Sequence, residues 1–247
     1  AMVEFFLRGD FRYFWPENIG NFAHFPSAWD SSLNTGIGQS QIGSLWITSY
    51  LNFTAFFSKL GLSWDWISLL FWILPAIILS FFSSFSLFNY LFSRETRSRF
   101  AGKDKVKYSL LAGIIYTFNT YFLMILTGGQ LGVALSYSLA PLVFLGFIKL
   151  FENLTLKNSL FAGLILGLQI IFDPRIVYIT LLGILFYFIF NLSKIKLSKR
   201  KQLLSVPFFI AVLLNSFWIL PLILTKSSAL PSGFNSIEGF KFFSFAD

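Results

Sequence analysis

The residues best suited to chemistry gather near the start of the chain, between Gly9 and Gln41. Carboxylates, an arginine and aromatic rings stand there at close spacing: Asp10, Arg12, Tyr13, Trp15, Glu17, His24, Trp29 and Asp30. A carboxylate can act as a general base, and the planar guanidinium of an arginine can pair with a phosphate. We therefore interpret this stretch as the place where the protein does chemistry or binds a polar ligand.

Each of these residues also has a structural explanation, and the sequence leaves both open. Asp10 follows a glycine, as turn and helix-capping aspartates commonly do. Arg12 is equally typical of an arginine bound to lipid headgroups. Asp30 suits a helix N-cap as well as a ligand. Glu17 follows a proline. It can sit in the first turn of a helix, where its negative charge interacts favourably with the helix dipole.

The pattern assigns no cofactor. The chain has a single histidine, His24, and no cysteine, which excludes disulfides, thiol nucleophiles and cysteine metal sites. A divalent cation held by carboxylate oxygens alone stays open. The 247 residues contain no phosphate-binding glycine-rich loop, nucleophile elbow or ATPase signature, so the sequence does not indicate an ATP-driven pump.

The composition predicts an all-α integral membrane protein. Hydrophobic residues make up 55% of the chain and charged residues only 12%, against about a quarter charged in a typical soluble domain. The net charge of +8 comes mainly from basic residues in short loops between apolar segments, which is an orientation signal of membrane proteins. We therefore expect membrane lipid as a partner and no nucleic acid.

Apolar segments long enough to cross a bilayer predict about six transmembrane helices: 66–92, with a kink at Pro75, then 108–126, 131–151, 154–172, 176–192 and 203–224. The purely apolar part of the fourth is only 159–172, about 21 Å long against a hydrocarbon core of about 30 Å. It is either re-entrant or spans with Lys157 reaching the interface. Its Gly163 and Gly167 have the spacing of closely packed helices. Polar residues inside spans should hydrogen-bond between helices: Asn119, Gln169 and Asn215.

Residues 40–60 place their apolar side chains on one helical face, and Gly61 suits the helix end. We interpret this segment as an amphipathic helix at the membrane interface, with Trp46 and Tyr50 near headgroup level. An ordinary helix packed on the bundle is the alternative.

Charge predicts the topology. Loops 93–107, 149–157 and 193–202 hold thirteen of the 19 basic residues and share one side if all segments span. The positive-inside rule places 93–107 and 193–202 in the cytoplasm. Residues 1–65 then form an extracytoplasmic loop that carries the candidate site, 66–224 the transmembrane bundle, and 225–247 a truncated extracytoplasmic segment. We expect the chain to be a fragment that lacks a preceding membrane helix.

The turn Asp173-Pro174-Arg175 lies on the outer side by this topology, together with Asp10. It places both signs of charge at a helix–helix turn, which suits a binding site. A tight turn with a local ion pair is the structural alternative.

The stretch GDFRYFWPENIGNF…AWDSSLNTGIGQSQ resembles the first outer loop of polytopic GT-C glycosyltransferases, most of all the α-(1→3)-arabinofuranosyltransferase-like family. The shared features are a Gly-Asp start, a Trp-Asp element followed by a glycine, and a later Gln or Asn. Here they are Gly9-Asp10, Trp29-Asp30, Gly36 or Gly38, and Gln39 or Gln41. FDPR at 172–175 and LNSFWILP at 214–221 also resemble segments of that family.

The resemblance implies a transferase of a prokaryotic plasma membrane that moves a hexose or pentose from a polyprenyl-phosphate-linked donor to a cell-surface glycan or glycolipid on the outer face. Asp10 would be the catalytic base. The substrate-binding residues would be Arg12, Trp15, Trp29, Asp30, Gln39, Asp173 and Arg175, with an arginine at the departing phosphate and the tryptophans stacked on sugars. Enzymes of this type usually have more spans than this chain, so part of the site should lie outside it.

Two other functions share this architecture. A transporter or flippase for a polar or lipid-linked substrate would need charges in the middle of spans, and the sequence places few there. A non-catalytic membrane assembly protein would carry a degenerate site on the same scaffold.

Overall fold

The computed structural model describes residues 19–27, 29–30, 39–40, 45–95, 103–191 and 201–225. Regular structure in these described residues is helical apart from one short antiparallel pair, β1 (Trp29–Asp30) and β2 (Gln39–Ser40). The α-helices are α3 (Leu45–Ala55), α4 (Trp64–Ser68), α5 (Leu74–Glu95), α6 (Lys103–Thr117), α7 (Thr120–Thr127), α8 (Leu131–Glu152), α9 (Leu156–Phe172), α10 (Pro174–Phe190), α11 (Val206–Leu214) and α12 (Ser216–Thr225). Short 3₁₀ turns are η1 (Ile19–Phe22), η4 (Phe56–Leu60) and η7 (Lys201–Leu204), and η5 (Leu69–Ile73) is a π-helical turn.

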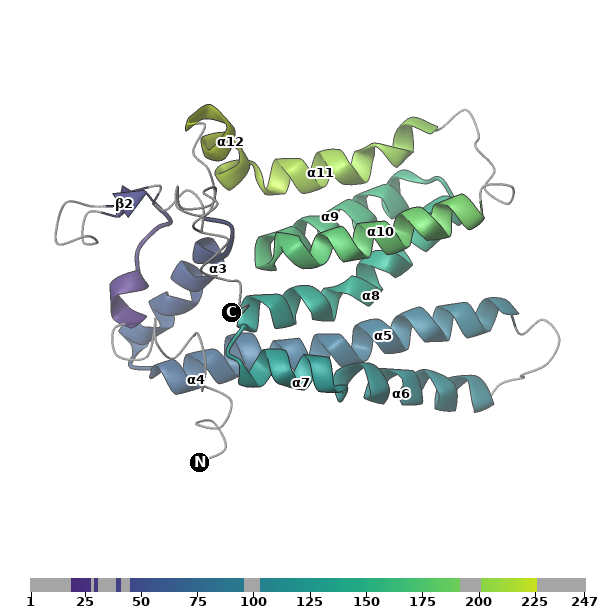
Figure 1. The fold of residues 1–247 in the computed structure, drawn as a ribbon, viewed down its shortest axis with the longest axis horizontal. Helices are drawn as coiled ribbons and strands as arrows, with labels where there is room; N and C mark the ends of the chain where they lie inside the picture. Colours follow the sequence, from purple (N-terminus) through teal and green to yellow (C-terminus); the bar gives the residue numbers. More distant parts are fainter. Residues whose placement is uncertain are drawn as a thin grey trace, which may run out of the picture.

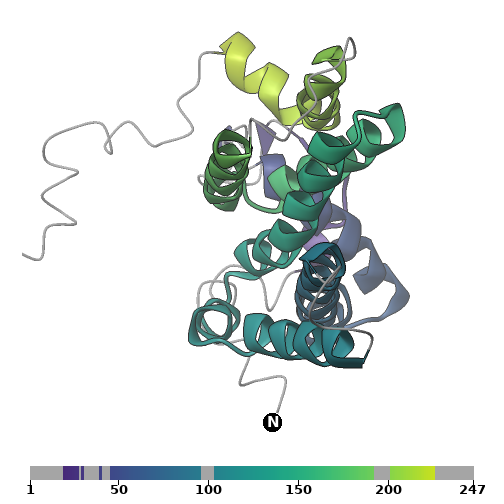
Figure 2. The ribbon, with the colours of Figure 1, turned by 90° about the vertical axis from the view of Figure 1, so that its right-hand side faces the viewer.

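The long helices run in alternating directions along one axis (Figure 1). Helix α8 is central: α5 and α9 pack on it, α6 packs on α5, α11 on α9, and α10 on both α8 and α9. Figure 2 shows this arrangement end on. At one end, here called the α3 end, lie α3, α4, α12 and the α9–α10 turn. At the other, the basic end, α5 and α10 finish and α6, α9 and η7 begin.

Among the described residues, two helices are long and apolar enough to cross a membrane, 64–93 and 131–152. Two further pairs qualify if each bent pair counts as one span: α6 with α7, bent by 41°, and η7–α11 with α12, bent by 77°. Helices α9 and α10 have 17 residues each, or about 26 Å, somewhat short of the hydrocarbon core. The described part of the chain therefore contains two to four candidate spans, where the sequence predicts about six.

Two asparagines cause the breaks that the apolar pattern does not reveal. The Asn119 side chain accepts a hydrogen bond from the Phe122 N–H and caps α7, so α6 ends just before it. At the other break, the Asn215 amide donates to Gly167 O of α9 (3.1 Å), and its oxygen accepts from Trp218 Nε1 (2.8 Å). The predicted hydrogen bonds between helices are thus confirmed for both residues, since Asn119 also donates to the Tyr137 hydroxyl of α8 (2.8 Å).

The helix around Pro75, where the sequence predicts a kink, contains a wider, π-helical turn. A proline has no N–H to offer the carbonyl four residues earlier and its ring crowds that carbonyl. The π-helical turn η5 comes directly before the proline, and Phe71 O accepts a hydrogen bond from the Tyr50 hydroxyl of α3 instead (2.6 Å). Burial raises the pKa of Tyr50 to about 12, so its hydroxyl stays protonated and can donate.

Helix α8 also contains a proline, Pro141, which leaves the carbonyl four residues earlier without its helical hydrogen bond. Its orphaned carbonyl belongs to Tyr137, and the Tyr116 hydroxyl of α6 donates to that oxygen (2.9 Å). The two tyrosine rings also stack, with centroids 4.4 Å apart. At both Pro75 and Pro141, a hydroxyl from a neighbouring helix therefore donates to the carbonyl that the proline leaves without its helical partner.

Tyr116→Phe should lower the free energy of unfolding in detergent by about 1–2 kcal/mol, because a buried carbonyl loses its donor while the stacking remains. The loss should shrink in a Pro141→Ala background, since the alanine N–H then serves the Tyr137 carbonyl. Tyr178→Phe is the control, because that side chain is 74% exposed. Equal losses in both backgrounds would contradict this role of the hydroxyl.

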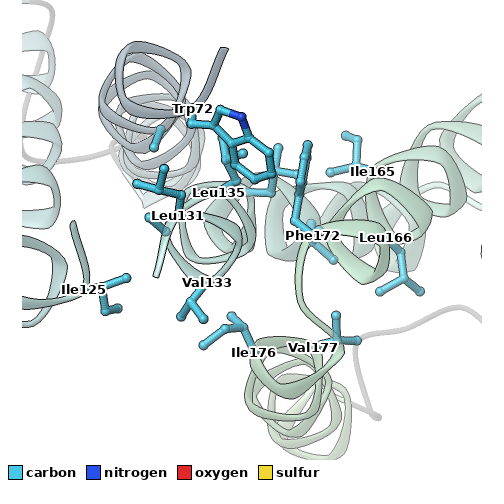
Figure 3. Close-up of a cluster of buried hydrophobic side chains, with 14 of the residues drawn as sticks. Trp72, Ile125, Leu131, Val133, Leu135, Ile165, Leu166, Phe172, Ile176 and Val177 are labelled. Carbon is cyan, nitrogen blue, oxygen red and sulfur yellow. The ribbon is translucent and has the colours of Figure 1, made fainter. Parts of the chain in front are cut away.

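Buried side chains join the helices at the α3 end (Figure 3). Trp72 of η5 packs near Leu131 and Leu135 of α8 and Phe172 of α9. Ile176 of α10 lies beside Val133, on the opposite side of α8. Close contacts tighten the same region: a Cβ at Gly132 would stand 2.9 Å from Phe172 O. The turn between α9 and α10 is therefore held firmly against the start of α8.

The segment predicted as an interfacial helix forms α3 and η4, and Gly61 ends it with φ +85°, as predicted. Leu51 and Ala55 are buried, and α3 packs against η1 and α9. Tyr50 lies between the rings of Trp72 and Phe172. These contacts favour a helix packed on the bundle, and its position relative to a membrane interface stays a prediction.

Candidate functional site

The structure describes the side chains of two predicted site residues, Asp173 and Arg175. Trp29, Asp30 and Gln39 are described by their backbone alone, and β1 and β2 place Asp30 directly opposite Gln39. Asp10, Arg12 and Trp15 lie outside the described residues, so their roles stay predictions. The pairing of β1 with β2 brings together two elements of the family resemblance that are separated by the intervening loop.

Asp173 is a fully buried helix cap. Its Oδ1 accepts a hydrogen bond from the backbone N–H of Arg175 (2.7 Å), and Pro174 occupies the first turn of α10. Aspartate before a proline is a favoured start for a helix, because the carboxylate bonds a free N–H and the proline needs none. The turn interpretation of Asp173-Pro174-Arg175 is thus confirmed.

The same carboxylate orients Arg175. Nε and Nη2 of the guanidinium donate to Oδ1 and Oδ2, with Nη2 at 2.7 Å from Oδ2. The Arg175 side chain is 70% exposed and the Asp173 side chain 0%. In the part of the chain that the structure describes, Nη1 has no hydrogen-bond partner. The buried acid therefore acts as a positioning residue, and the arginine is the member of the pair that can meet a ligand.

Polar contacts within the bundle fix the backbone under this pair. The Ser136 hydroxyl of α8 donates to Asp173 O (3.0 Å) and contacts Gln169 O (3.2 Å). The Gln169 amide donates to Ser136 O (3.1 Å) and to the Thr180 hydroxyl of α10 (2.8 Å), which confirms its predicted interhelical bonding. Three helices thus hold the turn that carries Arg175.

A groove lined by tyrosines begins beside the first turn of α10. It has a volume of about 370 Å³, and we call it the tyrosine groove; its lining includes Tyr116, Tyr121, Tyr137, Phe144, Ile176 and Ile179. Ile176 follows Arg175 directly, and Ile179 is one helical turn further along. Tyr121 and Ile179 are exposed, so the groove opens sideways between α7 and α10.

Sequence reasoning did not identify the tyrosine groove. Its tyrosines come from three helices, α6, α7 and α8, and each taken singly is typical of a membrane-interface aromatic. The one available signal is local: Tyr116 and Tyr121 flank Asn119, and the break at Asn119 turns both toward Tyr137.

Nothing in the described ranges marks a metal centre. No group of three or more potential ligands (His, Cys, Asp or Glu) occurs among those residues. His24 is exposed, and its Nδ1 contacts Phe25 O (2.7 Å). Asp10 and Glu17, which would supply carboxylates to a cation, are outside the described part of the chain.

Comparison of the chain with protein-family models, curated proteins and solved structures finds no match. The assignment of function therefore depends on the residues and on the geometry just described.

Proposed function

We propose that the protein is a membrane glycosyltransferase of the GT-C type, acting on the outer face of a prokaryotic plasma membrane. It transfers a sugar from a polyprenyl-phosphate-linked donor to a cell-surface glycan or glycolipid. The observation that carries the proposal is the exposed guanidinium of Arg175, held by buried Asp173 where the tyrosine groove begins.

An amphiphile with one anionic head and a long hydrocarbon tail fits this arrangement. The outward edge of the Arg175 guanidinium offers N–H donors to phosphate oxygens. The tyrosine groove offers an apolar, aromatic wall along α10 to the first part of the tail. Helix α10 also exposes apolar side chains such as Ile179 and Leu182, as expected for a lipid-facing helix.

In the proposed reaction, an acceptor hydroxyl attacks the anomeric carbon of the donor sugar. Asp10 takes the hydroxyl proton while the new C–O bond forms and the bond from the anomeric carbon to the phosphate oxygen breaks. The carrier phosphate leaves with the bonding electrons, and Arg175 or Arg12 stabilises its charge. Trp15 and Trp29 would stack on the sugars, and Asp30 and Gln39 would bind their hydroxyls.

Arg175→Gln should weaken binding of a polyprenyl phosphate by roughly tenfold to a hundredfold, because a charged hydrogen bond to the phosphate is lost. Binding is measured on the full-length protein in detergent. The substitution also leaves the Asp173 carboxylate buried without its partner, which destabilises the fold by itself.

The double variant Asp173→Asn with Arg175→Gln separates these effects. Asparagine still caps a helix and carries no charge, so stability should recover while binding stays weak. Recovery of binding together with stability would contradict a phosphate role for Arg175. Movement of the lipid across vesicle membranes without any sugar transfer would favour the flippase alternative.

A further inference from the structure

Most hydroxyl groups in the wall of the tyrosine groove are already used inside the bundle. The Tyr116 hydroxyl donates to Tyr137 O (2.9 Å), and the Tyr137 hydroxyl accepts a hydrogen bond from the Asn119 amide (2.8 Å). The Thr180 hydroxyl accepts from the Gln169 amide (2.8 Å) and donates to a carbonyl of its own helix (3.1 Å). These groups have little left to offer a ligand, so the inner wall of the groove suits a hydrocarbon chain.

Tyr121 of α7 also lines the groove, and its hydroxyl is in a different position. Among the residues that the structure describes, no group forms a hydrogen bond with this hydroxyl. The Tyr121 side chain is 44% exposed, and its ring packs on the ring of Tyr137 with centroids 5.6 Å apart. A phenolic hydroxyl can both donate and accept, and it loses free energy in apolar surroundings unless it finds a partner. A polar group of a ligand at the mouth of the groove would supply that partner.

Tyr121 and Arg175 lie at the same opening and come from two different helices. Arg175 is followed on α10 by Ile176, which lines the groove together with Tyr121. The hydrogen bonds to Asp173 raise the pKa of Arg175, and Tyr121 is close enough for its charge, when it is ionised, to raise that pKa further. An anion at this opening therefore has a guanidinium and a phenolic hydroxyl within reach.

We propose that Tyr121 donates a hydrogen bond to the phosphate of the carrier lipid, beside the guanidinium of Arg175. This inference rests on the proposed function, because it places the same carrier in the same groove. A phosphate has enough oxygens for both donors, and a hydrogen bond to an ionised acceptor is about twice as strong as a neutral one. Tyr121 thereby helps the site to distinguish a phosphate ester from an uncharged lipid alcohol, and it takes no part in the proton transfer.

The test compares a polyprenyl phosphate with the polyprenol of the same chain length, each binding to the full-length protein in detergent. Tyr121→Phe should weaken binding of the phosphate roughly threefold to tenfold. Binding of the polyprenol should be unchanged, because phenylalanine keeps the ring and removes only the hydroxyl. Tyr108→Phe is the matched control, since that side chain is 46% exposed on α6 and does not line the groove.

Two results would overturn this role of Tyr121. One is binding of the phosphate by Tyr121→Phe at the wild-type affinity. The other is equal weakening for the phosphate and the polyprenol, which would mean that Tyr121 only supports the tail or the fold.

The double variant Asp173→Asn with Arg175→Gln, measured alongside, separates this inference from the proposed function. If the double variant weakens binding of the phosphate and Tyr121→Phe does not, only the role of Tyr121 fails. If neither weakens it, the phosphate site of the proposed function fails as well.

Discussion

Asp10→Asn is expected to lower the rate of sugar transfer by at least about a hundredfold, because an amide cannot accept the proton of the acceptor hydroxyl. The measurement is transfer of a labelled sugar from a polyprenyl-phosphate donor by the full-length protein in detergent. Binding of the carrier lipid should be unchanged, since the proposed phosphate contact belongs to an arginine, Arg175 or Arg12, and not to Asp10.

Asp65→Asn serves as the matched control for this experiment. Asp65 is an exposed carboxylate in the first turn of α4, at the α3 end of the bundle, and its substitution should leave transfer unchanged. Undiminished transfer by Asp10→Asn would remove the glycosyltransferase assignment. A parallel loss of carrier binding would instead point to a structural role for Asp10.

The largest expected loss of stability follows from Gly163→Ala. A Cβ at Gly163 would stand 2.9 Å from both Cα and O of Pro207, so α9 and α11 must move apart. Overpacking of this kind costs about 1–3 kcal/mol in free energy of unfolding. Thermal unfolding in detergent, followed by size-exclusion chromatography after heating, measures the effect.

Gly183→Ala is the control, because it makes the same change in the middle of α10 without the clash. The added Cβ meets only Phe144 Cε2, at the ordinary contact distance of 3.6 Å. Alanine is the better helix former by about 1 kcal/mol, so this variant should be as stable as the wild type or more stable. Similar losses in the two variants would mean that close contact of α9 with α11 is not what Gly163 provides.

The Gly163 prediction also shows which part of the sequence pattern was informative. The spacing of Gly163 and Gly167 indicates a face of α9 on which another backbone can approach closely. The glycine spacing does not identify the partner helix, because any helix with a smooth surface could pack against this face. In the structure the partner is α11, whose Ala211 and Leu214 lie against Gly167.

The same distinction, between what the sequence pattern indicates and what packing adds, applies to the candidate site. The order Asp-Pro-Arg is sufficient to predict a turn with a capped helix and a local ion pair, since those effects act between residues adjacent in sequence. Which partner is buried depends on neighbours distant in sequence, here Ser136 and Gln169 on other helices. From the sequence, Asp173 and Arg175 are equally good candidates for binding a substrate. The structure distinguishes them, because Asp173 is buried and positions the exposed cation of Arg175.

By itself, the sequence determined the helical class, the apolar helices and the turns between them, because hydrophobic length, glycine and proline act locally. Tertiary structure decided where the helices break. An asparagine inside an apolar run ends a helix only when neighbouring groups form hydrogen bonds with its side chain. Tyr137 does so for Asn119, and Gly167 does so for Asn215. Tertiary structure also decided the tyrosine groove, because the groove needs side chains from several helices at one place.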